Sequence, residues 1–235
     1  RKSGARLSFT ETPKYILKGD SIWFNNISEN GYVEGKAIIH SKADSVFVMG
    51  DFVEKNTEKG VMKVYGPETI LQKYDLQDTL FIMADTLLTV EDSLGEQSEI
   101  YAYKNVEIYK GSVQGISDSL LYALKDSTIF FFDDPVVWSD SSQVVGDTIR
   151  VFFKNDELNR IYTDGNSFTI NLHHMQQYDQ IKGRNSIANF VDDELVKVKV
   201  LGNGECLYYL NNENEKEFTG VNVIECSSMN VYFKE

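Results

Sequence analysis

One short pattern of polar and apolar positions returns along the chain. An acidic residue is followed by serine or threonine, and then by apolar residues at every second position. Clear copies begin at Asp20, Asp44, Asp85, Asp118 and Asp147, and looser copies begin at Asn185 and Ser227. Because strand side chains alternate between two faces, each copy predicts a β-strand with one apolar face. The mean step of about 35 residues indicates one structural unit used repeatedly.

Each copy is followed by a turn signal and a second alternating run. The predicted turns lie at 29–31, 56–60, 92–95, 125–127, 155–156 and 192–194. Asn30-Gly31 is the strongest hairpin signal, because both central residues of such a turn need a positive φ. Val196–Val200 alternates strictly, as a strand with one buried and one wet face does. We therefore expect an all-β chain of repeated antiparallel hairpins, each continued beyond a break at glycine, asparagine or proline.

The two ends of the chain differ from the repeats. Residues 1–18 are polar, and we expect a lead-in segment with one edge strand near Tyr15–Leu17, followed by a repeat domain over 19–235. The last copy stops at Val231–Glu235 without a returning strand. This predicts either a fragment of a longer protein or a terminal edge that pairs with a partner.

Composition and charge narrow the function. The chain has 235 residues, of which 42% are hydrophobic, and a formal net charge of −13. This acidity argues against nucleic-acid binding and against a polybasic membrane anchor. No run of about 18 apolar residues and no signal-peptide pattern is present, which fits a cytosolic protein or a processed secreted one. Cys206 and Cys226 allow a disulfide, although two buried free thiols are favoured.

Catalytic and metal-binding signals are weak. His173, His174 and Asp179 could hold a metal, but a surface loop is the favoured interpretation, and His40 stands alone. The acid pairs at 133–134 and 192–193 fall at turns and predict solvated loop residues. The acid and hydroxyl that open each copy predict a structural corner, because such side chains bond to nearby backbone. We therefore expect no enzyme activity, no metal and no cofactor.

The apolar positions of the copies share one side of their strands. Stacked together, they predict a continuous apolar lining. Periodicity favours an ordinary core filled by its own side chains, and a lipid-holding groove is the alternative.

The repeat resembles that of the OstA/LptA-type family of lipopolysaccharide-transport proteins. Gly35–Ile39 and Asn105–Ile108 are similar to the family's incoming strand, and Ala84–Leu87 and Gly146–Ile149 to its outgoing strand. A long insert around His173–Gln180 departs from the family pattern, as does Asn185 in place of aspartate. The resemblance implies an elongated V-shaped β-jelly roll in the periplasm.

The same resemblance implies a non-enzymatic bridge toward the outer membrane. Acyl chains of lipopolysaccharide would lie inside the V, and the sugar head group would face water. Other jelly-roll transport components, or a head-to-tail homo-oligomer, would join through terminal edge strands. The implied lipid-binding residues are Ile22, Phe24, Val46, Val48, Leu87, Val106, Ile108, Leu120, Tyr122, Val136, Trp138, Ile149, Val151, Phe153 and Ile187.

Two other functions stay open. A structural or carbohydrate-binding module would have a dry interior and exposed aromatic side chains, such as Trp23 and Trp138, in a shallow outer cleft. A β-helical polysaccharide-processing enzyme would need clustered carboxylates, and the acids here are spread along the chain.

Overall fold

The structure is a computed structural model that describes residues 8–13, 15–25, 27–42, 45–74, 79–139, 141–174, 177–211 and 218–233. These residues form seventeen β-strands, paired antiparallel wherever a register is given, and no α-helix. Within the described ranges there is accordingly no helix long and apolar enough to cross a membrane. The predicted all-β fold of repeated antiparallel hairpins is confirmed.

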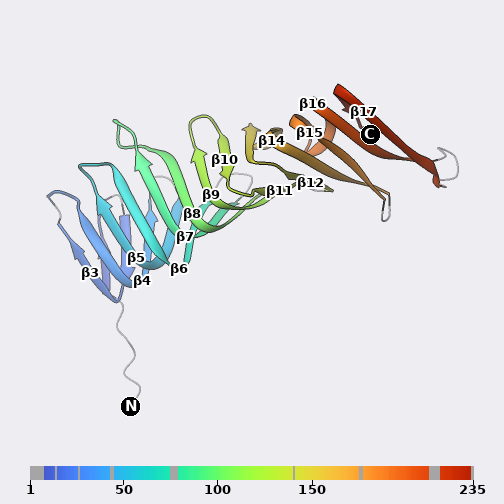
Figure 1. The fold of residues 1–235 in the computed structure, drawn as a ribbon. Coiled ribbons are helices and arrows are strands. Elements are labelled where there is room, and N and C mark those ends of the chain that lie inside the picture. Colours follow the sequence, from blue (N-terminus) through green and yellow to red (C-terminus); the bar gives the residue numbers. More distant parts are fainter. Residues whose placement is uncertain are drawn as a thin grey trace, which may run out of the picture. The chain divides into compact units, whose positions relative to one another are not determined.

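The strands form two compact units. Unit 1 comprises residues 1–111 and 118–126, and unit 2 comprises residues 112–117 and 127–235. Unit 1 contains β1 (Ser8–Glu11), β2 (Tyr15–Gly19), β3 (Ser21–Phe24), β4 (Gly31–Ser41), β5 (Val46–Asn56), β6 (Val61–Tyr74), β7 (Thr79–Glu91) and β8 (Gln97–Lys110) (Figure 1). Unit 2 contains β10 (Thr128–Phe132), β11 (Val136–Ser139), β12 (Ser142–Val145), β13 (Thr148–Lys154), β14 (Glu157–His174), β15 (Gln177–Val191), β16 (Glu194–Asn211) and β17 (Phe218–Tyr232). Strand β9 (Val113–Ala123) contributes to both units.

The long strands are interrupted near their middle by a bulge. In unit 1 the register shifts between β5 and β6 and between β6 and β7, and in unit 2 between β14 and β15 and between β15 and β16. Paired residues with positive φ accompany these shifts or breaks, at 35–36, 104–105, 133–134, 165–166 and 202–203. A bulge adds an unpaired residue and bends the strand. We call this line of bulges the crease, and it divides each long strand into two halves.

Acidic side chains hold the crease. Asn166 Nδ2 donates to Asp147 Oδ1 at 2.9 Å, and Asn105 Nδ2 donates to Asp85 Oδ1 at 3.1 Å. The backbone N–H of Asp20 donates to the carbonyl of Gly35 at 2.8 Å. Asp85 and Asp147 therefore have a structural role at the crease within the strand pairs, and their side chains bond to asparagine side chains and not, as predicted, to nearby backbone. Asp44 lies outside the described residues.

Two local predictions need correction. The hairpin before β4 does not use positive φ at Asn30 and Gly31; Glu29 has a φ of 55° instead. A Cβ on Gly31 would lie 2.6 Å from the Trp23 carbonyl oxygen, so glycine is needed there for close approach. The expected edge strand near Tyr15–Leu17 exists as β2, but it pairs with both β1 and β4. The expected boundary at residue 18 falls inside β2.

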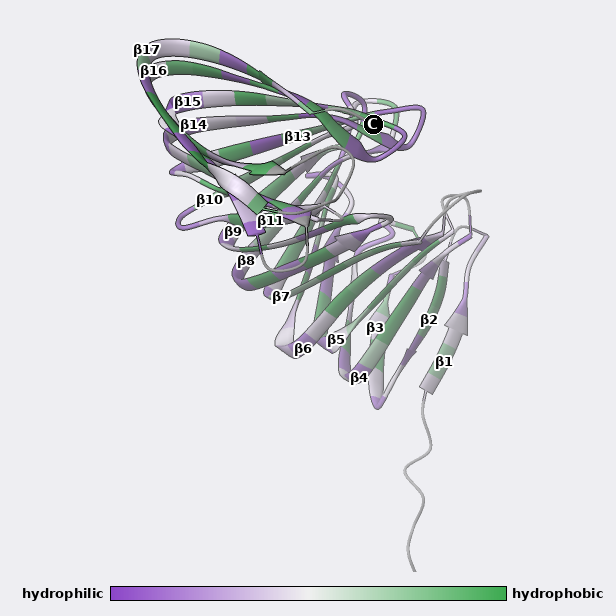
Figure 2. Cartoon of the chain, turned by 90° about the vertical axis from the view of Figure 1, so that its right-hand side faces the viewer, coloured by the Kyte–Doolittle hydropathy of each residue, from purple (hydrophilic) through white to green (hydrophobic). Residues whose placement is uncertain are grey.

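Both halves of the strands bury apolar side chains. In β7, Ile82 and Ala84 precede the bulge and Leu87 follows it, and all three are at most 6% exposed. In β8, Ala102 and Val106 flank the crease in the same way. The bulge therefore keeps the apolar positions of both halves on one side, while hydrophilic and hydrophobic residues alternate along the strands (Figure 2). This inward face is the core of each unit.

Candidate functional site

Most of the proposed lipid-binding residues lie on the inward face. Ten of them are at most 8% exposed: Val46, Val48, Leu87, Val106, Ile108, Leu120, Tyr122, Ile149, Val151 and Phe153. Ile22 and Phe24 occupy the alternate, half-buried positions of β3, whereas Trp23 between them is 52% exposed. Twelve of the residues are thus interior side chains contributed by successive hairpins.

The other three, Val136, Trp138 and Ile187, lie on the outward face. In β11 the buried residues are Val137 and Ser139, which are 0% and 2% exposed. In β15 the buried residues are Ser186 and Ala188. A shift of one residue moves every side chain of a strand to the opposite face. In both strands the residues that face the interior are therefore one position away from those that the sequence pattern predicts.

Two small hollows lie in the interior of unit 1. The first interior hollow is lined by Tyr15, Leu17, Phe24, Gly31, Tyr32, Val33, Ile39, Val53, Lys55 and Met62, and has a volume of about 10 Å³. The second is lined by Tyr15, Ile39, Ser41, Val46, Val48, Met62, Thr89, Glu91, Gly95 and Gln97, and has about 40 Å³. The first has room for about one water molecule. Ile39 and Val53 come from opposite sides of the crease, so side chains of the two half-sheets meet here.

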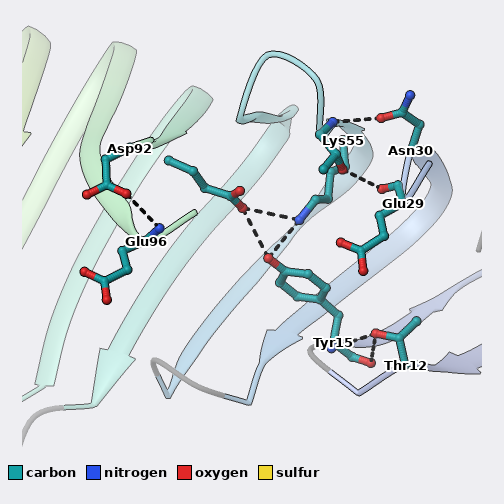
Figure 3. Close-up of polar contacts among 9 residues, drawn as sticks. Thr12, Tyr15, Glu29, Asn30, Lys55, Asp92 and Glu96 are labelled. Atoms are coloured by element: carbon teal, nitrogen blue, oxygen red, sulfur yellow. Dashed lines mark hydrogen bonds and ion pairs between the residues drawn. The ribbon is translucent and has the colours of Figure 1, made fainter. Parts of the chain in front are cut away.

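A polar cluster lies beside these hollows. Lys55 Nζ donates to the Tyr15 hydroxyl at 2.8 Å and lies 3.3 Å from Glu91 Oε1 (Figure 3). The ammonium also lies 4.0 Å from the centre of the Tyr15 ring. The Lys55 and Glu91 side chains are only 10% and 22% exposed. Withdrawing charges from water is unfavourable unless they are paired, and here each charge has a partner.

The sequence interpretation missed this cluster. Its members are far apart in the chain, with 76 positions between Tyr15 and Glu91. The one available signal is the register of β5, which places Lys55 two residues after the buried Val53 and so on the same face.

The turn at 92–96 also holds a charged pair. Asp92 Oδ1 accepts the backbone N–H groups of Leu94 and Glu96, and Lys125 Nζ donates to Asp92 Oδ2. The bond from Lys125, together with these backbone bonds, lowers the pKa of Asp92 to about 2. Asp92 is therefore ionised across the physiological range and acts as a turn-forming acceptor.

The alternative of a metal site at His173, His174 and Asp179 finds no support among the described residues. His173 Nδ1 lies 3.4 Å from Asp179 Oδ2, but the described part of the chain contains no group of three histidine, cysteine or acidic ligands. The His174 side chain and residues 175–176 lie outside the described residues. In the supposed insert around His173–Gln180, the described residues are the end of β14 and the start of β15, and these two strands are paired. The acid pair at 192–193 lies at a turn with positive φ, as predicted, whereas the pair at 133–134 has positive φ but lies at the crease between β10 and β11.

A larger hollow lies on the outward face of unit 2. We call it the Trp138 hollow. It has a volume of about 380 Å³ and is open to solvent. Its lining residues are Trp138, Ser141, Ser142, Gln143, Ile170, Tyr178 and Gln180.

The two cysteines are free thiols in neighbouring strands. Cys206 in β16 is 2% exposed, whereas Cys226 in β17 is half-buried and its Sγ donates to the Ser228 carbonyl at 3.3 Å. Burial, with smaller effects of Asp179 and Cys226, raises the pKa of the Cys206 thiol to about 11. The favoured expectation of free thiols agrees with this arrangement, although only Cys206 is fully buried.

The two thiols should differ in reactivity. At pH 8 about one Cys206 thiol in a thousand is ionised, and only the thiolate is nucleophilic. Iodoacetamide should therefore modify Cys226 and leave Cys206 intact until the protein is denatured, as mass spectrometry of tryptic peptides can measure. Because the folded-state pKa is raised above its reference value of 9.0, the protein should lose stability as pH rises from about 9 to 11. Equal alkylation rates at both thiols would contradict this assignment.

Comparisons with known proteins show a likeness to solved structures. No family model matches the chain, and no curated protein matches it significantly. Among solved structures, the chain is similar to LptH from Pseudomonas aeruginosa, described as the LptA homologous periplasmic component of the conserved lipopolysaccharide transport device. The TM-score is 0.32 and the identity 11%, over 62% of this chain and 80% of that chain. Likeness of this degree carries no conclusion about the function of the present chain.

Proposed function

We propose that the chain is a non-enzymatic carrier of acyl-chain lipids, with the chains held between the half-sheets of unit 1. The observation that supports this most is the first interior hollow, where apolar side chains from both half-sheets converge beside the Lys55–Tyr15–Glu91 cluster. An acyl chain there would contact Leu17, Ile39 and Val53, and the polar cluster would lie near the lipid's polar end.

Room for a lipid must come from movement of side chains. The first interior hollow has about 10 Å³, so an acyl chain would displace the half-buried Phe24 and Met62. Methionine is unbranched and adapts to irregular space. Burial contributes about 0.8 kcal/mol per methylene, so a dozen carbons would gain on the order of 10 kcal/mol. The lipid could then pass to a similar apolar interior of another protein, and no covalent step would be needed to release it.

We propose lipopolysaccharide as the cargo and the periplasm as the location, because the repeat resembles that of the OstA/LptA-type family. Partners would join at strand edges. Among the described residues, β17 pairs with β16 alone, and its Val221 and Val223 are 44% and 62% exposed. Exposed apolar edge strands are prone to pair with other chains. Another jelly-roll transport component, or a second copy of this chain, would suit that edge.

Photocrosslinking can test the carrier function. A benzophenone amino acid placed at position 24 should crosslink to bound lipopolysaccharide, because the Phe24 side chain lies in the interior. The same group at the adjacent position 23 should crosslink far less, because Trp23 faces solvent. Crosslinked lipid would be measured on gels by staining and by mass spectrometry.

The two positions are a matched pair, since they are neighbours in one strand. Apolar burial also predicts that the signal at position 24 survives moderate salt. Equal crosslinking at both positions, or a signal lost in moderate salt, would contradict the proposal. Val48→Glu and Leu87→Glu, which place a charge at buried positions of unit 1, should also weaken lipid binding.

A further inference from the structure

The described residues that line the Trp138 hollow are all uncharged. They combine one indole, one phenol, two amides, two serines and one isoleucine. The whole chain is one-quarter charged residues and carries a net charge of −13. The described lining side chains supply no charge for an ion pair, so they would recognise a ligand through hydrogen bonds and apolar contact.

These side chains form a row across the sheet. Trp138 of β11 lies opposite Gln143 of β12, Gln143 lies opposite Ile170 of β14, and Ile170 lies opposite Gln180 of β15. Gln114 continues the row beyond Trp138, and Leu207 continues it beyond Gln180. Amide and apolar side chains therefore alternate along the row, which spans about 14 Å from Trp138 to Gln180 at the usual strand spacing.

One hydrogen bond fixes the orientation of Trp138 in this row, while other polar side chains of the hollow have no hydrogen-bond partner in the described part of the chain. Trp138 Nε1 donates to Gln143 Oε1 at 2.9 Å, which fixes the indole and occupies one lone pair of the amide oxygen. Within the described residues, the Gln180 amide and the Tyr178 hydroxyl have no hydrogen-bond partner. Tyr178 is 45% exposed and projects from the next row of the same face. The hollow thus offers aromatic surface beside free donors and acceptors.

We infer that the Trp138 hollow binds a neutral saccharide on the outward face of unit 2. The C–H face of a pyranose ring is apolar and suits the Trp138 indole, while its hydroxyl groups match the amides of Gln143 and Gln180. An acyl chain would leave those amides without partners. A peptide strand would find no free backbone, because β12 is paired with β11 and β14, and β14 is paired with β15. This site is separate from the interior and does not depend on the carrier function.

Intrinsic fluorescence can report this site alone. The chain has two tryptophans, so Trp23→Phe leaves Trp138 as the single one. Titration with hexasaccharides of glucose and of N-acetylglucosamine should change the Trp138 emission in a saturable way, with dissociation constants in the millimolar range for so shallow a hollow. In that background Gln180→Ala should weaken binding about threefold to tenfold, as the loss of a hydrogen bond predicts, and Tyr178→Ala should also weaken it.

Matched variants separate binding from folding effects. Tyr109→Ala removes a tyrosine of the same 45% exposure outside the hollow and should leave the titration unchanged. Far-UV circular dichroism should be the same for all variants, since both changed residues in the hollow are on the surface.

The source of the saccharide can be distinguished in the same assay. Neutral phosphatidylcholine vesicles that display the same glucose sugar on a dialkyl lipid would bind more tightly than the free hexasaccharide if the natural ligand is a glycolipid head group, and no more tightly if it is a free glycan. Both results support a saccharide site. The absence of a saturable change with every sugar, or a change that persists undiminished in Tyr178→Ala and Gln180→Ala, would overturn the inference.

Discussion

Phe131→Ala is expected to lower the free energy of unfolding of unit 2 by about 3–5 kcal/mol, the range for removing a buried aromatic ring. Phe131 lies in β10 and is 0% exposed, and it is opposite Ile149 of β13. The substitution removes the ring's apolar contacts and leaves a cavity that the surrounding strands can fill only in part. Urea unfolding followed by circular dichroism would measure the loss.

Phe130→Ala is the matched control, because it removes the same ring from the adjacent residue. Phe130 is half-buried on the outward face, and its ring stacks on Phe132 at 6.4 Å. Loss of that stacking should cost about 1 kcal/mol. Hydrogen exchange of β13 amides would show whether unit 2 itself opens. Equal losses for the two variants would mean that the inward face of β10 is not the core of the unit.

The hairpins could be predicted from the sequence because their causes are local. Period-two alternation marks each strand, and short polar residues mark each turn. Asn155 and Asp156 have φ values of 54° and 67°, and Asp192 and Asp193 have 49° and 65°. These residues tolerate the left-handed region, so a turn was predictable at both places.

The face of each strand was harder to predict, because cross-strand pairing decides where the bulge falls. In β5 the crease is at Asp51, whose Cβ would lie 2.9 Å from a Cβ on Gly66, rather than at the predicted opening, Asp44. In β15 the crease is at Arg184, whose Cβ would lie 3.2 Å from a Cβ on Gly202. The alternation therefore starts at Arg184, one residue before Asn185, and Ile187 faces outward. The Gly202-Asn203 break in the next strand was the signal that could have set this register.

Neither candidate site could be assembled from local patterns. The Lys55 cluster joins β2, β5 and β7, and the Trp138 hollow joins β11, β12, β14 and β15. Trp138 was chosen for its apolar character and assigned to the interior, yet the structure places it outside beside Gln143. The alternative of Trp23 and Trp138 in a shallow outer cleft places Trp138 on the outward side, where the structure has it, although its side chain is half-buried.

Gly35→Ala is expected to lower the free energy of unfolding of unit 1 by about 1–3 kcal/mol, the usual cost of a strained backbone conformation. Gly35 has a φ of +72°, and a Cβ there would lie 2.9 Å from the Cβ of Asp20 and closer still to its carboxylate. The Asp20 N–H bond to the Gly35 carbonyl holds the two strands at this separation. The new methyl group would therefore have to push the crease apart, and thermal unfolding would measure the effect.

Gly95→Ala separates the cost of backbone strain from the cost of the contact with Asp20. Gly95 lies in the same unit as Gly35 and has nearly the same φ. Gly95 has a φ of +77°, but a Cβ there would have nothing within 4 Å. Its substitution should cost only the conformational part, about 1 kcal/mol. The difference between the two variants measures how tightly Asp20 and Gly35 are packed. If the two losses are equal, close packing of acid against glycine does not stabilise the crease, and the bulges alone must bend the strands.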